Sequence, residues 1–260
     1  MAYEPETRAQ LERDAKEIIA RYPKTRSALL PLLHLVQSVD GHITQDGIEF
    51  CAEQLDITPA QVTGVSTFYT QYKRNPVGDY HVGVCINTLC AVMGGDQIWS
   101  EVSDHLGVGH DEATPDGRVS IERIECNAAC DFAPVMTVNW EFFDNMTPEK
   151  AKDLVDDLRT GKEVLPSRGP KSLCTWKEAS RVLAGFPDGK AGEGLQAGAE
   201  SLVGLALAKE RGWTAPRTDV DRPQPDEPVK PSEISDPPPN EPGKPIGGTV
   251  KPGSQEGENK

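Results

Sequence analysis

Four of the six cysteines are arranged in two pairs, and their spacing is the strongest indication of chemistry in this chain. Four residues separate Cys85 from Cys90, and three separate Cys126 from Cys130. Cysteine thiolates are the usual ligands of iron–sulfur clusters, and four of them complete a [2Fe–2S] centre. Each iron of such a cluster needs two protein ligands, so two separate pairs suit it. We therefore expect these four cysteines to be the metal ligands and the cofactor-binding residues.

A structural zinc site and a set of ordinary buried thiols are the alternatives. Zinc also binds four cysteines in a tetrahedral arrangement, but its commonest pair has only two residues between the cysteines. The spacing favours a cluster and leaves zinc open. Of the two remaining cysteines, Cys51 lies in a helical stretch and is expected to be a small core residue. We assign no role to Cys174.

Each cysteine pair follows directly on a predicted strand, where rigid scaffolds often present functional groups. Residues 80–84 alternate and are rich in β-branched side chains, which predicts a strand that runs into Cys85. A second strand, over residues 118–125, leads to Cys126. The glycines of Met93-Gly94-Gly95 either turn the chain into the next helix or let backbone N–H groups approach a cluster. Further strands are predicted over 135–140 and 141–143, with helices over 96–106 and from Thr147 to Gly161.

The N-terminal residues 1–75 are expected to form a helical bundle. Helices are predicted over residues 7–21, from a cap at Ser27 to a stop at Gly41, over 47–55, and from Thr58 onward. In the last of these helices, Pro59 takes the first position and Gln61 closes a capping box. Its buried side is expected to carry Val62, Val65 and Phe68.

The rest of the chain divides into three regions. Residues 76–164 have the strand and helix order of a small α/β domain with a mixed sheet. Residues 165–214 form a partly helical extension, with helices expected over 176–186 and 202–211. Residues 215–260 contain 11 of the 22 prolines and no aromatic residue, so we expect an extended or disordered tail.

The charge of the chain excludes several classes of function. With 27 Lys and Arg against 41 Asp and Glu, the net charge is -14, which argues against nucleic acid and against anionic lipid. We find no secretory signal and no apolar stretch of about 20 residues that could span a membrane. We therefore expect a cytosolic protein that reaches a membrane only through a complex. No phosphate-binding or dinucleotide-binding loop is recognisable, and we expect no catalytic residue.

Around the cysteines, the chain resembles the 24 kDa subunit family of respiratory complex I, known in bacteria as the E subunit of NADH-quinone oxidoreductase. The resemblance covers roughly residues 10–162. The similar segments are Gly64-Val-Ser-Thr-Phe68-Tyr69-Thr70, Cys85-Ile-Asn-Thr-Leu-Cys90, Thr114-Pro-Asp-Gly-Arg118, Ile124-Glu-Cys126-Asn-Ala-Ala-Cys130-Asp-Phe-Ala-Pro134-Val-Met136 and Asn145-Met-Thr147-Pro148-Glu.

The resemblance implies an α+β protein with an N-terminal helical bundle, a thioredoxin-like α/β domain over 76–164 and a long, mostly irregular C-terminal extension. It implies a [2Fe–2S] cluster with Cys85 and Cys90 on one iron and Cys126 and Cys130 on the other. The chain would be an electron-transfer subunit of a proton-pumping NADH:quinone oxidoreductase. Its cluster would exchange electrons with FMN on the partner subunit that also binds NADH. The neighbouring iron–sulfur subunit would be a second partner, in the peripheral arm on the cytoplasmic side of the inner membrane.

The sequence departs from the family in two ways. The family usually has Leu-Gly after the third cysteine, where this chain has Asn127-Ala128; this leaves the local hydrogen bonding open. The chain also continues well past the family domain, an extension that looks actinobacterial. Three other interpretations stay open: the equivalent subunit of an NAD-linked hydrogenase or formate dehydrogenase, a zinc-stabilised adaptor without a redox role, and a free-standing thioredoxin-like ferredoxin.

Overall fold

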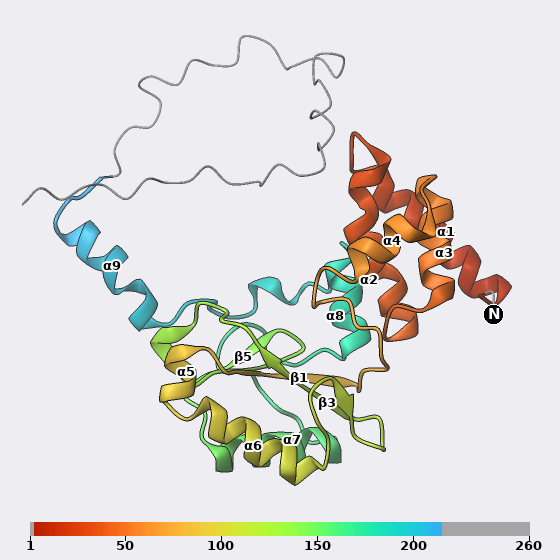
Figure 1. Ribbon diagram of the computed structural model, residues 1–260. Helices are drawn as coiled ribbons and strands as arrows, with labels where there is room; N and C mark the ends of the chain where they lie inside the picture. The colour runs from red at the N-terminus through yellow and green to blue at the C-terminus, as the bar shows by residue number, and fades with distance from the viewer. Residues whose placement is uncertain (1–2, 215–260) are drawn as a thin grey trace, which may run out of the picture. The chain divides into compact units, whose positions relative to one another are not determined.

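The computed structural model describes residues 3–214 of the chain, so the proline-rich segment 215–260 lies outside the described residues. The described residues up to Arg211 form one compact unit. The finer division at residues 75, 164 and 214 stays a prediction. The expected α+β class is confirmed, with helices and one mixed sheet (Figure 1).

The N-terminal part is helical, as predicted. Gly41 ends the second helix in the left-handed conformation, at φ 81°, and Thr58 and Gln61 form the expected capping box of the fourth. The helices are α1 (Pro5–Ile19), α2 (Leu29–Asp40), α3 (Gln45–Leu55) and α4 (Pro59–Ser66). Their apolar faces meet in a core that includes Leu11, Ile18, Leu32, Leu33, Phe50, Cys51 and Val62.

Two details of the predicted helices are wrong. Ser27 does not cap α2; it lies in a 3-10 turn, Thr25–Ala28, and α2 begins without a side-chain cap. The 3-10 turn runs directly into α2, so the helix follows other helical residues and has no separate capping residue. Phe68 is not on the buried side of α4; it follows the end of that helix and is 77 % exposed.

The sheet has five strands in the order β2-β3-β1-β4-β5. Strands β1 and β3 are parallel neighbours, and Cys85 at the end of β1 lies opposite Ile124 at the end of β3. The other pairs are antiparallel. The sequence did not predict β2, because two residues are too few to show an alternating pattern. The strands are β1 (Tyr80–Cys85), β2 (Glu112–Ala113), β3 (Val119–Ile124), β4 (Met136–Val138) and β5 (Glu141–Phe143).

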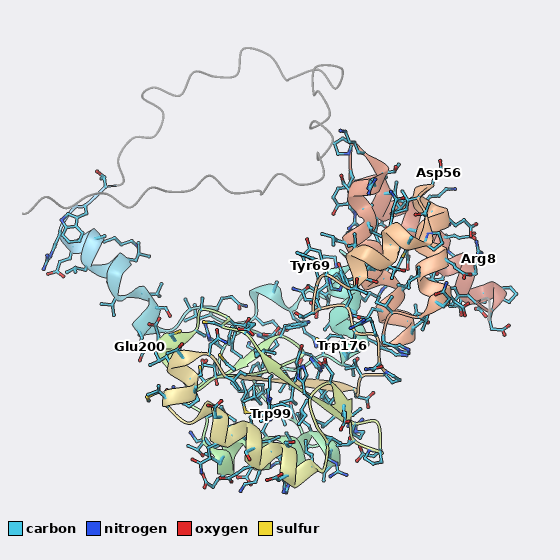
Figure 2. The ribbon with its side chains drawn as sticks, in the orientation of Figure 1. Arg8, Asp56, Tyr69, Trp99, Trp176 and Glu200 are labelled. Atoms are coloured by element: carbon cyan, nitrogen blue, oxygen red, sulfur yellow. The ribbon has the colours of Figure 1, made fainter. Side chains whose placement is uncertain are left out.

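Helices α6 (Gly95–Leu106) and α7 (Pro148–Thr160) lie side by side on one face of the sheet (Figure 1). Alternate strand residues point to that face, as the period of a strand requires. Trp99 of α6 is buried in this layer (Figure 2). The shared core includes Val82, Val84, Ile98, Val102, Ile121, Met136, Leu154 and Leu158.

The opposite face of the sheet carries a buried polar network at its centre. His81 of β1 places its Nδ1 atom 2.9 Å from the Ser120 hydroxyl and its Nε2 atom 2.8 Å from the Glu122 carboxylate. Lys73, from the segment between α4 and β1, lies 2.8 Å from Glu122 and 3.1 Å from Asp111. The side chains of Lys73 and Glu122 are only 8 % and 7 % exposed. The network therefore ties the segment after the helical bundle to the sheet.

The extension after α7 returns along the molecule and adds two helices, close to where they were predicted. Helix α8 (Trp176–Leu183) packs against α2. The Trp176 indole donates a 2.8 Å hydrogen bond to the Gly41 carbonyl oxygen, and its ring centre lies 5.1 Å from that of His81. Helix α9 (Ala199–Glu210) buries no residue completely. None of the helices between residues 3 and 214 has the length and apolar character needed to cross a bilayer.

Replacing Glu122 by Gln should lower the free energy of unfolding by roughly 3 kcal/mol, because it leaves the buried Lys73 ammonium without its closest carboxylate. Urea denaturation of the full chain measures this change. Glu101→Gln is the matched control, since it removes one partner of the solvent-screened Lys152–Glu101 pair and should cost far less. Equal losses in the two variants would contradict a special contribution of the buried pair.

The same network should make stability fall in acid. Burial lowers the pKa of His81 below its ordinary 6.5, against the opposing effect of its hydrogen bond to Glu122. Burial alone would raise the pKa of Glu122, but hydrogen bonds from His81 and Lys73 hold it below 4.5. The unfolded chain therefore binds protons first, and stability should decline as the pH falls below about 6.5 and again below about 4.5. In urea titrations across this range, His81→Gln should reduce the upper step without abolishing it, because burial also lowers the pKa of His34, to about 4; an unaltered profile would contradict this assignment.

Candidate metal centre

The four candidate cysteines come from two places that the sheet brings together. Cys85 is the last residue of β1, and Cys126 follows the end of β3 by two residues. Because β1 and β3 are parallel neighbours, their carboxyl ends lie at the same edge of the sheet. Cys90 lies in the short helix α5 (Thr88–Val92), and Cys130 begins the 3-10 turn Cys130–Phe132.

The thiols of each pair lie close together. The Sγ atoms of Cys126 and Cys130 are 3.8 Å apart. Two sulfurs on one tetrahedral metal, with metal–sulfur bonds of about 2.3 Å, are separated by about 3.8 Å. The Cys85 thiol interacts with the Cys90 thiol and, more weakly, with that of Cys126; Cys130 also interacts electrostatically with Cys85. The donor set and the spacing of the second pair therefore fit a thiolate-bound metal centre.

The four thiols are arranged as two pairs rather than around one point. Within residues 3–214, no group of three or more His, Cys, Asp or Glu side chains is placed to hold a single metal ion. A [2Fe–2S] cluster does not need such convergence, since its two irons each take two protein ligands.

The two pairs differ in exposure. Cys85 and Cys90 are buried, at 1 % and 3 % exposure, in a small apolar cluster with Ile124 and Phe132. Cys126 and Cys130 are exposed. Burial raises the pKa of the Cys85 thiol to about 11, and the hydrogen bond with Cys126 raises the pKa of Cys130. A metal that binds these residues must therefore displace protons from them.

Two glycines near the thiols allow α6 to pack closely against the buried cysteines. Gly94 begins α6 at φ 114°, so the glycine pair does form the turn into this helix. A Cβ atom on Gly95 would lie 2.5 Å from the Cys85 carbonyl oxygen and 2.9 Å from that of Cys90. Glycine at this position is therefore needed for α6 to pack against both buried cysteines, a role that the sequence did not predict.

Ala128 stands where the family usually has glycine. Its φ of 55° lies in the left-handed region that favours glycine. Its backbone N–H nevertheless donates a 3.3 Å hydrogen bond to the Cys126 sulfur. Hydrogen bonds of this kind, from a backbone N–H to a cysteine sulfur, tune the potentials of iron–sulfur clusters.

Two acidic side chains next to the candidate ligands accept hydrogen bonds from nearby polar side chains. Glu125 accepts a 2.7 Å hydrogen bond from Asn87, and Asp131 accepts one of 2.9 Å from Ser201 of α9.

The two remaining cysteines lie outside the candidate metal centre. Cys51 is buried in the helical core, as predicted, and burial raises the pKa of its thiol. Cys174 is partly buried, with a pKa raised by burial to about 11, and lines a separate cavity of about 220 Å³ beside α8.

Replacing Ala128 by Gly should raise the free energy of unfolding by about 0.5–1 kcal/mol, because glycine adopts the left-handed conformation without the Cβ clash. Thermal and urea denaturation measure the change. Ala129→Gly is the control: Ala129 has φ −104° and is buried, so glycine should destabilise it. A loss of stability in Ala128→Gly would show that the loop does not hold the left-handed conformation.

Comparisons with known proteins place the sequence in a family. The family described as thioredoxin-like [2Fe–2S] ferredoxin matches residues 15–159, a range that contains all four cysteines. The E subunit of the NADH-quinone oxidoreductase of Mycobacterium tuberculosis is 57 % identical over 218 residues, which cover 84 % of this chain and 86 % of the relative. Subunit 2 of the NADH-quinone oxidoreductase of Thermus thermophilus is 38 % identical over 152 residues, or 57 % of this chain and 84 % of that one.

Solved structures give weaker likenesses. An NAD+-reducing [NiFe]-hydrogenase has a TM-score of 0.46 at 15 % identity, over 51 % of this chain and 23 % of that one. A thioredoxin-like [2Fe–2S] ferredoxin from Aquifex aeolicus has a TM-score of 0.28 at 21 % identity, over 34 % of this chain and 86 % of that one. On the family match and the sequence relatives, the chain belongs to the thioredoxin-like [2Fe–2S] ferredoxins and, among them, to the E subunits of NADH-quinone oxidoreductase, an oxidoreductase of several subunits.

Proposed function

We propose that this chain is the electron-transfer subunit of a respiratory NADH:quinone oxidoreductase and that Cys85, Cys90, Cys126 and Cys130 bind its [2Fe–2S] cluster. The observation that carries the proposal is the meeting of the two cysteine pairs at the carboxyl ends of β1 and β3. The expected pairing is Cys85 with Cys90 on one iron and Cys126 with Cys130 on the other.

The residues around the thiols suit one-electron transfer, which is the chemistry that the cluster supplies when bound. The buried pair, Cys85 and Cys90, keeps water from one side of the site. The exposed pair, Cys126 and Cys130, leaves the other side open to a redox partner. The Ala128 N–H offers positive partial charge to the Cys126 thiolate, which raises the cluster potential. The acidic side chains of Glu125 and Asp131 act in the opposite direction.

The partners proposed for this chain are the subunit that binds FMN and NADH and the neighbouring iron–sulfur subunit of the peripheral arm. The absence of a recognisable nucleotide-binding loop from the sequence supports a flavin and NADH site on another subunit. We also propose that the chain works on the cytoplasmic side of the inner membrane and reaches the membrane only through the complex. The 57 % identical mycobacterial relatives favour the respiratory enzyme over a hydrogenase or formate dehydrogenase.

Replacing Cys85 or Cys126 by Ala should remove the cluster, because either change leaves one iron with a single protein ligand. Wild type should contain about two irons and two sulfides per chain and give the EPR signal of a reduced [2Fe–2S] centre. Both variants should lose most of this iron and the signal. Cys174→Ala, at a partly buried cysteine that we do not count as a ligand, should keep both.

Two results would contradict the proposal. Wild-type iron in Cys85→Ala or Cys126→Ala would refute the ligand assignment. A colourless, EPR-silent wild-type protein with one bound zinc would favour the zinc-stabilised adaptor instead.

A further inference from the structure

The guanidinium of Arg168 lies next to the loop that carries Cys126 and Cys130, where an ion pair and two aromatic rings hold it in place. Its Nε atom lies 3.1 Å from a carboxylate oxygen of Asp144, and the two side chains are only 15 % and 9 % exposed. Its Cζ atom lies 4.0 Å from the ring centre of Phe142 and 5.2 Å from that of Phe132. A planar guanidinium can stack on rings while it pairs with a carboxylate, so this side chain has little freedom to move.

Phe132 connects this arrangement to the proposed ligands. It lies two residues after Cys130, in the same 3-10 turn, and its ring belongs to the apolar cluster that contains Cys85 and Cys90. Its carbonyl oxygen accepts a 2.8 Å hydrogen bond from the Asn145 N–H. A shift of the Phe132 ring would therefore move the turn that carries Cys130.

The extension makes two more contacts with the same turn. A Cβ atom on Gly198 would lie 2.5 Å from the Phe132 ring, so the backbone of residue 198 packs directly against it. The Ser201 hydroxyl donates a 2.9 Å hydrogen bond to Asp131. Arg168 joins these contacts together, since its Nη1 atom donates a 3.1 Å hydrogen bond to the Gln196 carbonyl oxygen.

We propose that Arg168 is a positioning residue for the cluster: through Phe132 it fixes the turn that carries Cys130, and it fastens residues 196–201 over that turn. This role rests on the proposed cluster site. The turn needs such support because Cys126 and Cys130 lie outside the strands and are exposed. Arg168 follows the segment that matches the family, which ends at residue 159. The support therefore comes from the extension rather than from the family domain.

The test compares Arg168→Ala with a control in the full-length chain, with its cluster for the iron and EPR measurements and without metal for hydrogen exchange. Arg181→Ala is the matched control, because Arg181 is also in the extension, pairs with Asp14 at 2.9 Å and stacks on Phe186 at 4.2 Å, but packs on the helical bundle. Three measurements are made on each variant: the rate at which a chelator removes iron, the EPR g-values of the reduced cluster, and hydrogen exchange over residues 126–133 in the metal-free chain.

Loss of support to the ligands of a metal typically weakens its binding about 10–100-fold. Arg168→Ala should therefore speed iron loss by roughly tenfold or more, shift the g-values and speed exchange over residues 126–133. Arg168→Lys, which keeps the charge but not the planar stack, should lie between Arg168→Ala and wild type. This milder variant also serves if Arg168→Ala does not fold. Arg181→Ala should leave all three measurements as in wild type.

Two patterns would overturn the positioning role. One is a wild-type rate of iron loss and unchanged g-values in Arg168→Ala, with the cluster present. The other is an equal change in Arg181→Ala, which would mean that any weakening of the extension has the same effect. A wild-type chain without iron would instead refute the proposed function, and the hydrogen-exchange comparison separates that failure from a failure of the support itself.

Discussion

The parallel pairing of β1 with β3 is the interaction on which the candidate metal centre depends. Two cysteine pairs about 40 residues apart can meet only because the register sets Cys85 opposite Ile124, and so brings Cys126 to the same edge of the sheet. Parallel strands need a crossover connection, which here contains α5 and α6. Cys90 lies on this connection, and Gly95 allows its next helix to close against both buried cysteines. The crossover is thus both a covering layer and part of the site.

The two faces of the sheet differ in chemistry: one is apolar and the other carries buried charged groups. One face buries an apolar core against α6 and α7 and stabilises the fold by removing apolar surface from water. The other face holds the ion pair of Lys73 and Glu122, with His81 hydrogen-bonded to it. Burying charges costs free energy that their attraction repays only with good geometry. What the network contributes is a specific attachment between the segment after the helical bundle and the sheet, to which Trp176 adds a second link through Gly41.

The loop that carries Cys126 and Cys130 is the least regular part of the site. It has one residue, Ala128, in the left-handed conformation and only a short 3-10 turn. Its order comes from outside: from the apolar contact of Phe132 with the buried cysteines, and from the extension through Arg168 and Ser201. An exposed metal site is accessible to a redox partner, but it is also accessible to water. Contacts from a later segment of the chain can shield part of such a site from water.

The local features of this protein can be read from its amino-acid sequence. Spacing singled out the four cysteines, alternation predicted β1 and β3, and capping residues such as Thr58 and Gly41 marked helix ends. These signals are readable because each depends on neighbours in the chain. Ser27 and Phe68 were placed wrongly, because a cap signal and an apolar side chain do not reveal where the chain turns or what covers it.

Which distant segments of the chain come into contact is visible in the folded protein alone. Three contacts join residues more than 20 positions apart in the chain: the pairing of β1 with β3, the ion pair of Lys73 with Glu122, and the packing of Arg168 on Phe132. The order of the strands in the sheet also differs from their order in the chain. Such contacts are set by packing and by hydrogen bonding between elements, and no local pattern encodes them. The sequence thus predicted the candidate ligands, and the fold specified the geometry in which these cysteines come together.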